Sequence, residues 1–376
     1  MRLKAHFFRK LITSYCSILV TSMLFCQSND AYILDSAAVK VYSNPDEAVK
    51  IAEYVYNRNN NYPKLQATAL LLLSNIASKK MQYDQSLNFA LKAKELSFKT
   101  RDLKLKLKVL NTIAMHYYIS GVYNNALQIL DEAEKISAEY PHKDSIRIIL
   151  GNNWGIRGAI YKEQLSPSIA LKYFIRAIGE FKKEAENPKA LINLSLIYYN
   201  MGYCNISLER NSEAKSDFNS ALYYADKIGA PNLIAYAKQG IAEVYTHEGK
   251  YSNAIKELQS AISISKKTEP DPELDCFIYK SLSDNYLATN DWKNYQVYSK
   301  KYFTAQEDNI IAKRKFIQES LEKTNTAIQQ EMNEHRLYFY FALTTILVLI
   351  CILIFTIIKD QIIFKAKLND LRAKLT

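Results

Sequence analysis

The amino-acid sequence predicts an all-α protein, in which a solenoid of about seven helix pairs is followed by a long stalk helix and one transmembrane helix. Three observations carry this prediction. A pattern of small and large apolar residues recurs through most of the chain, only 9 glycines and 8 prolines occur in 376 residues, and Leu337 to Ile358 form a run of 22 uncharged residues. No alternating pattern typical of strands competes with the helical one.

Residues 1–28 are predicted to be a signal peptide. The segment begins with the basic stretch MRLKAHFFRK, continues with the apolar stretch LITSYCSILVTSMLF, and ends in CQS, which offers small residues around a cleavage site before Asn29. Two alternatives stay open. One is a lipid anchor on Cys26, which the bulky Phe25 disfavours, and the other is an uncleaved N-terminal anchor.

Residues 29–304 repeat one pattern, which is clearest in NNWGIRGAIYKEQLSPSIALKYFIRAI. Its key residues are Trp154, Gly158, Tyr161, Ala170, Phe174 and Ala177. The position held by Ala170, which we call the anchor position, recurs at residues 48, 86, 126, 170, 214, 254 and 295, with spacings of 38 to 44 residues. Small residues let the two helices of a pair approach closely, and neighbouring pairs must stack to bury their apolar faces.

This pattern resembles the tetratricopeptide repeat (TPR), in which a helix with Trp-x2-Leu-Gly-x2-Tyr precedes a helix with Ala-x3-Phe. Arg157 departs from the Leu of that pattern, and Pro167 stands in the turn into the second helix, where proline is tolerated. The copies are longer than the standard repeat of about 34 residues, so the helices or turns must be longer. The resemblance implies an α-solenoid with a concave face that binds an extended peptide or a partner helix.

The resemblance also implies which residues line that groove. In the family, groove positions on the first helix fall one, five and eight residues after the position held here by Trp154. Carried across the copies, they include Asn111, Tyr118, Lys162, Tyr199, Tyr203, Gln239, Glu243, Lys280 and Asp284. Amide groups can hydrogen-bond a peptide backbone, and tyrosine offers a flat amphipathic surface. The alternative interpretation is an ordinary solvated helix face.

After the solenoid, residues 305–336 are predicted to form a juxtamembrane stalk helix, because the segment has many helix formers and no helix breaker. Residues 337–358 are predicted to form the transmembrane helix. A helix of this length spans about 33 Å, against a hydrocarbon core of about 30 Å. Both segments are therefore expected to belong to one membrane-embedded, single-pass chain.

Basic residues predict the orientation of the span. Arg336 stands alone just before it, and the residues after it include Lys359, Lys365, Lys367, Arg372 and Lys374. The positive-inside rule then places the C-terminus in the cytoplasm and the solenoid outside it, in the periplasm of an inner-membrane protein. In the tail, residues 359–376, a short coiled-coil seam is formed by Phe364, Leu368, Leu371 and Leu375. Stalk and tail are expected to pair with a second copy or with a partner helix.

Charge and motifs exclude several functions. Of the net charge of +11, residues 1–28 contribute +4 and the tail +3, so no nucleic-acid partner is indicated. The sequence contains no P-loop, GxSxG, HExxH or CxxC motif. His116, His142 and His247 lie in different copies and suggest no metal site. We therefore expect no enzymatic activity, no cofactor and no metal.

The layout as a whole resembles bacterial envelope sensors, in which an exported TPR solenoid, one span and a coiled coil lead to a cytoplasmic kinase or DNA-binding domain. The chain matches this layout only up to the start of the coiled coil, so neither activity is implied. One hypothesis is a sensor or adaptor that binds a peptide or protein outside the cytoplasm and acts in signalling or transcriptional regulation. The alternative is a structural scaffold for envelope protein assembly.

Overall fold

The computed structural model describes residues 30–38, 40–41, 44–80, 82–267 and 271–373, and every regular element in these ranges is a helix. The predicted signal peptide and Leu375 of the predicted tail seam lie outside the described residues. The chain divides into two compact units, residues 1–317 and residues 318–376. The first unit contains all the residues of the candidate site.

The first unit consists of helices joined by short turns. A helix over residues 30–38 precedes α2. The later elements are α2 (Pro45–Arg58), α3 (Pro63–Lys79), α4 (Tyr83–Phe98), α5 (Leu103–Ile119), α6 (Tyr123–Glu139), η1 (Lys143–Ile146), α7 (Arg147–Glu163), α8 (Pro167–Phe181), η2 (Lys182–Glu184), α9 (Pro188–Ser207), α10 (Asn211–Lys227), α11 (Pro231–His247), α12 (Tyr251–Ser265), α13 (Pro272–Ala288) and α14 (Trp292–Ala373).

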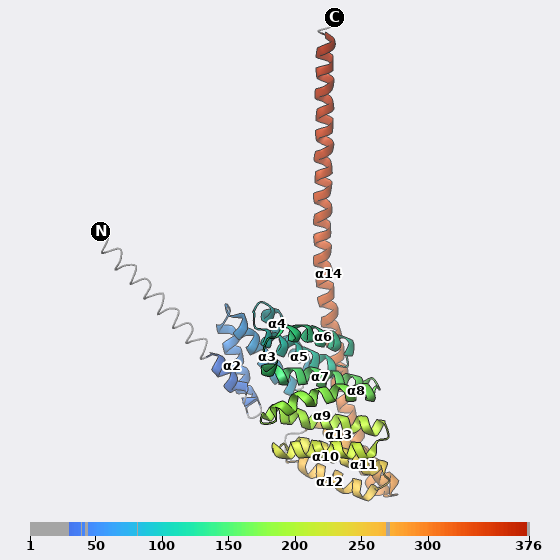
Figure 1. The fold of residues 1–376 in the computed structure, drawn as a ribbon. Helices are drawn as coiled ribbons and strands as arrows, with labels where there is room; N and C mark the ends of the chain where they lie inside the picture. Colours follow the sequence, from blue (N-terminus) through green and yellow to red (C-terminus); the bar gives the residue numbers. More distant parts are fainter. Residues whose placement is uncertain (1–29, 39, 42–43, 81, 268–270, 374–376) are drawn as a thin grey trace, which may run out of the picture. The chain divides into compact units, whose positions relative to one another are not determined.

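Consecutive helices pack in pairs, and each pair contacts the next. The pairs α3–α4, α5–α6, α7–α8, α9–α10 and α11–α12 follow one another along the first unit (Figure 1). The helix over residues 30–38 and α2 share one apolar core, and α13 meets the first turns of α14 through Tyr298. These contacts form the predicted TPR-like α-solenoid.

The anchor positions confirm the predicted register. The residues at these positions in the first six copies are fully buried, namely Ala48, Ser86, Ala126, Ala170, Ala214 and Ala254. The ring of Phe174 lies directly over Gly158, where an added Cβ would come within 2.5 Å of the ring. The small residues of the pattern are therefore the places where paired helices touch.

The turn inside each pair from α5–α6 onward contains one residue in the left-handed region, five residues before the anchor position. These residues, with φ between 56° and 74°, are Gly121, Leu165, Glu209, Gly249 and Asn290. The following amide closes the helix, as when the Ser166 N–H donates to the Tyr161 carbonyl at 2.9 Å. Leu165 and Glu209 adopt this conformation although only glycine does so without steric cost.

The second unit consists, over its described residues, of the remainder of α14. Within α14, Tyr338–Lys359 form a stretch of 22 residues that is long and apolar enough to cross a membrane, and none of it is buried. The aromatic residues at its start, Tyr338, Phe339, Tyr340 and Phe341, are exposed.

Candidate functional site

The candidate site is the face formed by the first helices of five successive pairs. Helices α5, α7, α9, α11 and α13 carry all nine residues predicted for the groove. Each of these helices also contacts the next one in the series. The five helices therefore lie side by side, and their side chains can form one continuous surface.

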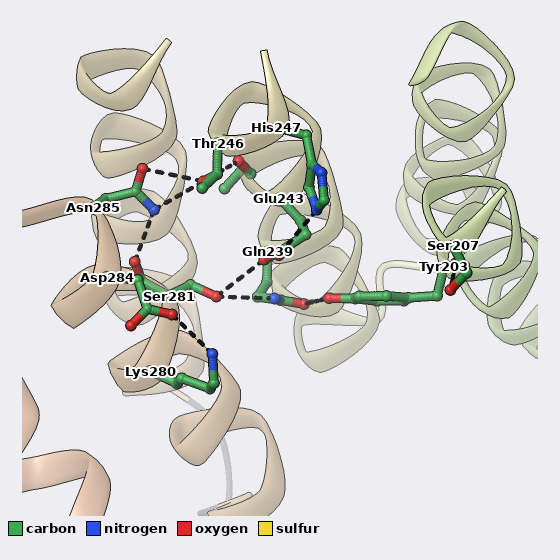
Figure 2. Close-up of polar contacts among 11 residues, drawn as sticks. Tyr203, Ser207, Gln239, Glu243, Thr246, His247, Lys280, Ser281, Asp284 and Asn285 are labelled. Carbon is green, nitrogen blue, oxygen red and sulfur yellow. Dashed lines mark hydrogen bonds and ion pairs between the residues drawn. The ribbon is translucent and has the colours of Figure 1, made fainter. Parts of the chain in front are cut away.

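Gln239 joins three of these helices. Its Oε1 accepts hydrogen bonds from the hydroxyl groups of Tyr203, at 2.7 Å, and Tyr199, at 3.1 Å, both on α9. Its Nε2 donates to Oγ of Ser281 on α13, at 3.3 Å (Figure 2). Gln239 itself is 2% exposed. Both ends of its amide are used inside the protein, so it fixes α9, α11 and α13 relative to one another.

A second set of polar contacts links α11 to α13. The Ser281 hydroxyl donates to Oε2 of Glu243 at 3.3 Å, and Nδ2 of Asn285 donates to the Thr246 hydroxyl at 2.8 Å. His247 lies on the far side of Glu243, with its Nε2 3.8 Å from Oε1 (Figure 2). Hydroxyl, amide and carboxylate groups thus follow one another along this part of the face.

In α13, the residues that contact α11 differ by one position from the predicted ones. Lys280 and Asp284 form an ion pair with each other at 2.8 Å, and both side chains are more than half exposed. Ser281 and Asn285 make the contacts to α11 instead. A hydroxyl or an amide can be buried if it forms one or two hydrogen bonds, whereas burying a charged group costs much more free energy. The uncharged Ser281 and Asn285 therefore face α11, and the charged Lys280 and Asp284 face water.

Three tyrosine rings pack against one another next to Gln239. The ring of Tyr199 stands edge-on to those of Tyr203, at 5.1 Å, and Tyr236, at 5.4 Å. The Tyr236 hydroxyl donates to Asp271 at the beginning of α13, at 3.2 Å. Burial raises the pKa of all three phenols above the ordinary value. The hydroxyl groups therefore stay protonated and act as donors.

Three further predicted residues lie toward the N-terminal half of the face. Asn111 is buried and donates to the Ile149 carbonyl on α7 at 2.7 Å, while its Oδ1 has no hydrogen-bond partner among the described residues. Lys162 donates to Oδ1 of Asn200 on α9 at 2.8 Å. Tyr118 is half-buried, with its ring 6.2 Å from that of Tyr123. Six of the nine predicted residues thus bond to a neighbouring first helix.

The prediction missed several residues of this network. Thr246 lies eight residues after Lys238, which occupies the position of Trp154, so the same count places it on the groove. Ser281 and Asn285 are offset by one residue from the count. Tyr236 lies before the counted positions, and no signal in its own copy distinguishes it from a core tyrosine.

No protein-family model matches the chain, and no curated protein matches it. Several solved structures share its fold. The Rap conjugation gene regulator of plasmid pLS20, in complex with the Phr* peptide, aligns at a TM-score of 0.58 and 16% identity, over 74% of this chain and 74% of that one. The apo form of RapI aligns at 0.57 and 14%, over 74% and 98%.

NprR in complex with its cognate peptide NprX aligns at a TM-score of 0.53 and 15% identity, over 73% of this chain and 78% of that one. At such low identity the likeness concerns the fold alone. Together with the helix pairing and the buried anchor positions, it defines the chain as a TPR-like repeat protein.

Proposed function

We propose that this chain is a membrane-anchored, TPR-like sensor or adaptor, which binds an extended peptide or an extended segment of a protein partner. The binding surface is the face formed by α5, α7, α9, α11 and α13. Occupation of that face outside the cytoplasm is coupled through α14 to signalling or transcriptional regulation. The proposed role includes neither catalysis nor a cofactor.

The contact network around Gln239 carries the binding proposal. It holds side chains of three successive repeats in fixed positions before any ligand arrives, which reduces the entropy lost on binding. Beside it, Lys280 and Asp284 keep both a positive and a negative charge accessible. Exposed charges of both signs on a surface fixed in this way suit a peptide, whose termini and polar groups need charged and hydrogen-bonding partners.

Proteins of the same fold support a peptide as the ligand. NprR and the pLS20 Rap regulator were each solved with a bound peptide. The identity of 15–16% to these proteins transfers no individual residue to this chain. The contacts within the chain itself therefore support this particular surface.

The membrane anchor is supported by the apolar stretch Tyr338–Lys359 and by the basic residues that follow it. We place the solenoid outside the cytoplasm and residues 359–376 inside. Protease added to cells with an opened outer layer should degrade the solenoid and spare an epitope on the tail. Protection of the solenoid in these opened cells would reverse the proposed orientation.

A charge-neutral pair of substitutions tests the binding surface without touching the buried network. Lys280→Ala with Asp284→Ala should reduce retention of the native partner by the full chain in membranes. The matched control is Asp226→Ala with Lys227→Ala, which removes an exposed acid and an exposed base from α10. Equal loss of retention in both variants would argue against this face.

A further inference from the structure

A shallow cavity of about 790 Å³, largely open to solvent, lies against α10, and none of the nine predicted groove residues lines it. Tyr198 of α9 lines the cavity, whereas its neighbour Tyr199 packs against Phe218 and Tyr236 in the groove network. The cavity is thus a second surface, separate from the face to which we assign peptide binding.

Hydroxyl and amide groups form one side of the cavity. Ser212, Ser216 and Ser220 line it at intervals of four residues, about one turn of α10 apart, and Asn219 lies between them. The Ser220 hydroxyl donates to the Ser216 carbonyl at 3.0 Å. Among the described residues, the side chains of Ser216 and Asn219 have no hydrogen-bond partner in the protein. These groups can donate to and accept from a polar ligand.

Three tyrosines add an aromatic surface. The rings of Tyr198 and Tyr224 stack at 5.7 Å with an interplanar angle of 10°. Tyr223 stands edge-on to Tyr224 at 5.2 Å and is 62% exposed. An aromatic ring that borders a polar cavity, yet stays accessible, can pack against the apolar face of a ligand.

Two lysines give the cavity a positive charge. The ammonium of Lys182 lies 5.8 Å from the ring centre of Tyr198, and that of Lys215 lies 4.8 Å from the ring centre of Tyr245. In the described part of the chain, neither lysine forms an ion pair. A hydrogen bond with Tyr198 raises the pKa of Lys182 above its ordinary value, so this group stays charged.

The cavity contains one carboxylate, Glu248, which already has a partner. Lys250 contacts it at 2.7 Å, and this hydrogen bond, with the charges of Lys250 and, to a smaller extent, Lys215, holds its pKa below the ordinary value. A single, already paired carboxylate does not suit a cation. Two lysines without an ion-pair contact among the described residues thus line the cavity against one carboxylate that is already paired, and this balance favours an anionic ligand.

We infer that this cavity binds an acidic saccharide, with its sugar ring against Tyr223, its hydroxyl groups at Ser216 and Asn219, and its acid group near Lys182 and Lys215. A saccharide combines the apolar ring face, the many hydroxyl groups and, when acidic, the negative charge that this lining accommodates. An acidic peptide would also satisfy the two lysines, and its backbone could bond to the hydroxyl groups, but aspartate and glutamate side chains offer no ring face to Tyr223.

The experiment uses the full chain in detergent micelles and a fluorescent tetrasaccharide of alternating glucuronate and N-acetylglucosamine, with binding followed by anisotropy. Maltotetraose and a tetra-aspartate peptide serve as unlabelled competitors. The acidic tetrasaccharide should bind, and neither competitor should displace it at equal concentration. Lys182→Gln combined with Lys215→Gln should weaken binding of the tetrasaccharide about tenfold or more. Adding Tyr223→Ala to this double variant should weaken binding further.

Lys227→Gln provides the control, because Lys227 is exposed on α10, the helix that carries Lys215, and does not line the cavity. Three results would each overturn the assignment: no binding of the tetrasaccharide, full binding by the double lysine variant, or displacement by tetra-aspartate as strong as by unlabelled tetrasaccharide.

Discussion

The hydroxyl group of Tyr203 donates a hydrogen bond of 2.7 Å to Oε1 of Gln239, which joins the first helix of one repeat to the first helix of the next. Tyr199 donates to the same oxygen at 3.1 Å. Gln239 is almost fully buried, so this acceptor is held in place between the two helices. The packing of α9 against α11 therefore depends in part on this one amide.

Replacement of Gln239 by leucine keeps the volume but removes the acceptor. We expect Gln239→Leu to lower the free energy of unfolding by roughly 2 kcal/mol, because two half-buried phenols lose their partner. Tyr203→Phe should cost about 1 kcal/mol in the native chain and close to nothing in the Gln239→Leu background. Urea unfolding of the full chain, followed by tryptophan fluorescence, measures both. Equal costs of Tyr203→Phe in the two backgrounds would contradict the proposed coupling.

Leu165 is strained by its backbone conformation. Its φ is 56° and its side chain is 89% exposed, so it contributes little packing in return. Leu165→Gly should therefore raise the free energy of unfolding by about 1 kcal/mol. The control is Gly121→Ala at the equivalent turn, where an added Cβ meets no atom within 4 Å and only the φ of 74° opposes it. This control should be destabilised, and a loss of stability in Leu165→Gly would refute the explanation.

Ala170 marks the close contact between α7 and α8. It is fully buried beside Phe174 and Ala177, so Ala170→Leu should overpack the site and cost about 1–3 kcal/mol. Ser168→Leu adds the same side chain at an exposed position of the same helical turn and should change stability little. A melting temperature of Ala170→Leu that matches the control would show that the anchor register is misplaced.

His116 predicts a dependence of stability on pH. Its Nε2 lies 2.9 Å from the Ser74 hydroxyl and 2.8 Å from that of Ser86, and burial lowers its pKa from 6.5 to about 4. Between these values the unfolded chain binds the proton and the folded chain does not. The free energy of unfolding therefore falls as the pH falls from about 6.5 to 4, by roughly 3 kcal/mol at most.

Asp217 acts in the opposite direction, because burial raises its pKa to about 6. As the pH falls toward 4, the folded chain binds this proton before the unfolded chain does, so the free energy of unfolding rises. The measurement therefore compares the native chain with His116→Gln at each pH, since Asp217 is common to both. The advantage of the native chain should shrink between pH 7 and pH 4. A difference in stability that stays constant over this range would show that His116 is not held neutral.

The helix pairs of the solenoid could be predicted from the sequence alone, for a physical reason. Small residues such as Ala126 and Ala254 can occupy an anchor position only where two helices touch, so their spacing reports the packing directly. The left-handed residues at Leu165 and Glu209 were not predictable, because neither is a glycine and only the closing hydrogen bonds reveal the turn.

The candidate site was predictable in part. Counting from the position of Trp154 identified Gln239, Tyr199 and Tyr203, which contact one another across two repeats. In α13 the same count selected Lys280, whereas Ser281 meets Gln239. The rotation of one helix against its neighbour depends on which side chains can be buried, and a fixed count carries no such information.

Site-specific photo-crosslinking shows whether the face formed by α5, α7, α9, α11 and α13 contacts the partner. Benzoylphenylalanine in place of Asp284, in place of Lys280 or, as a control, in place of Asp226 is introduced into the full chain in its native membrane. All three positions are exposed, so the label should not disturb folding. We expect the same crosslinked peptide or protein segment from positions 284 and 280 and none from position 226. Crosslinks from position 226 alone, or from none of the three, would contradict this expectation.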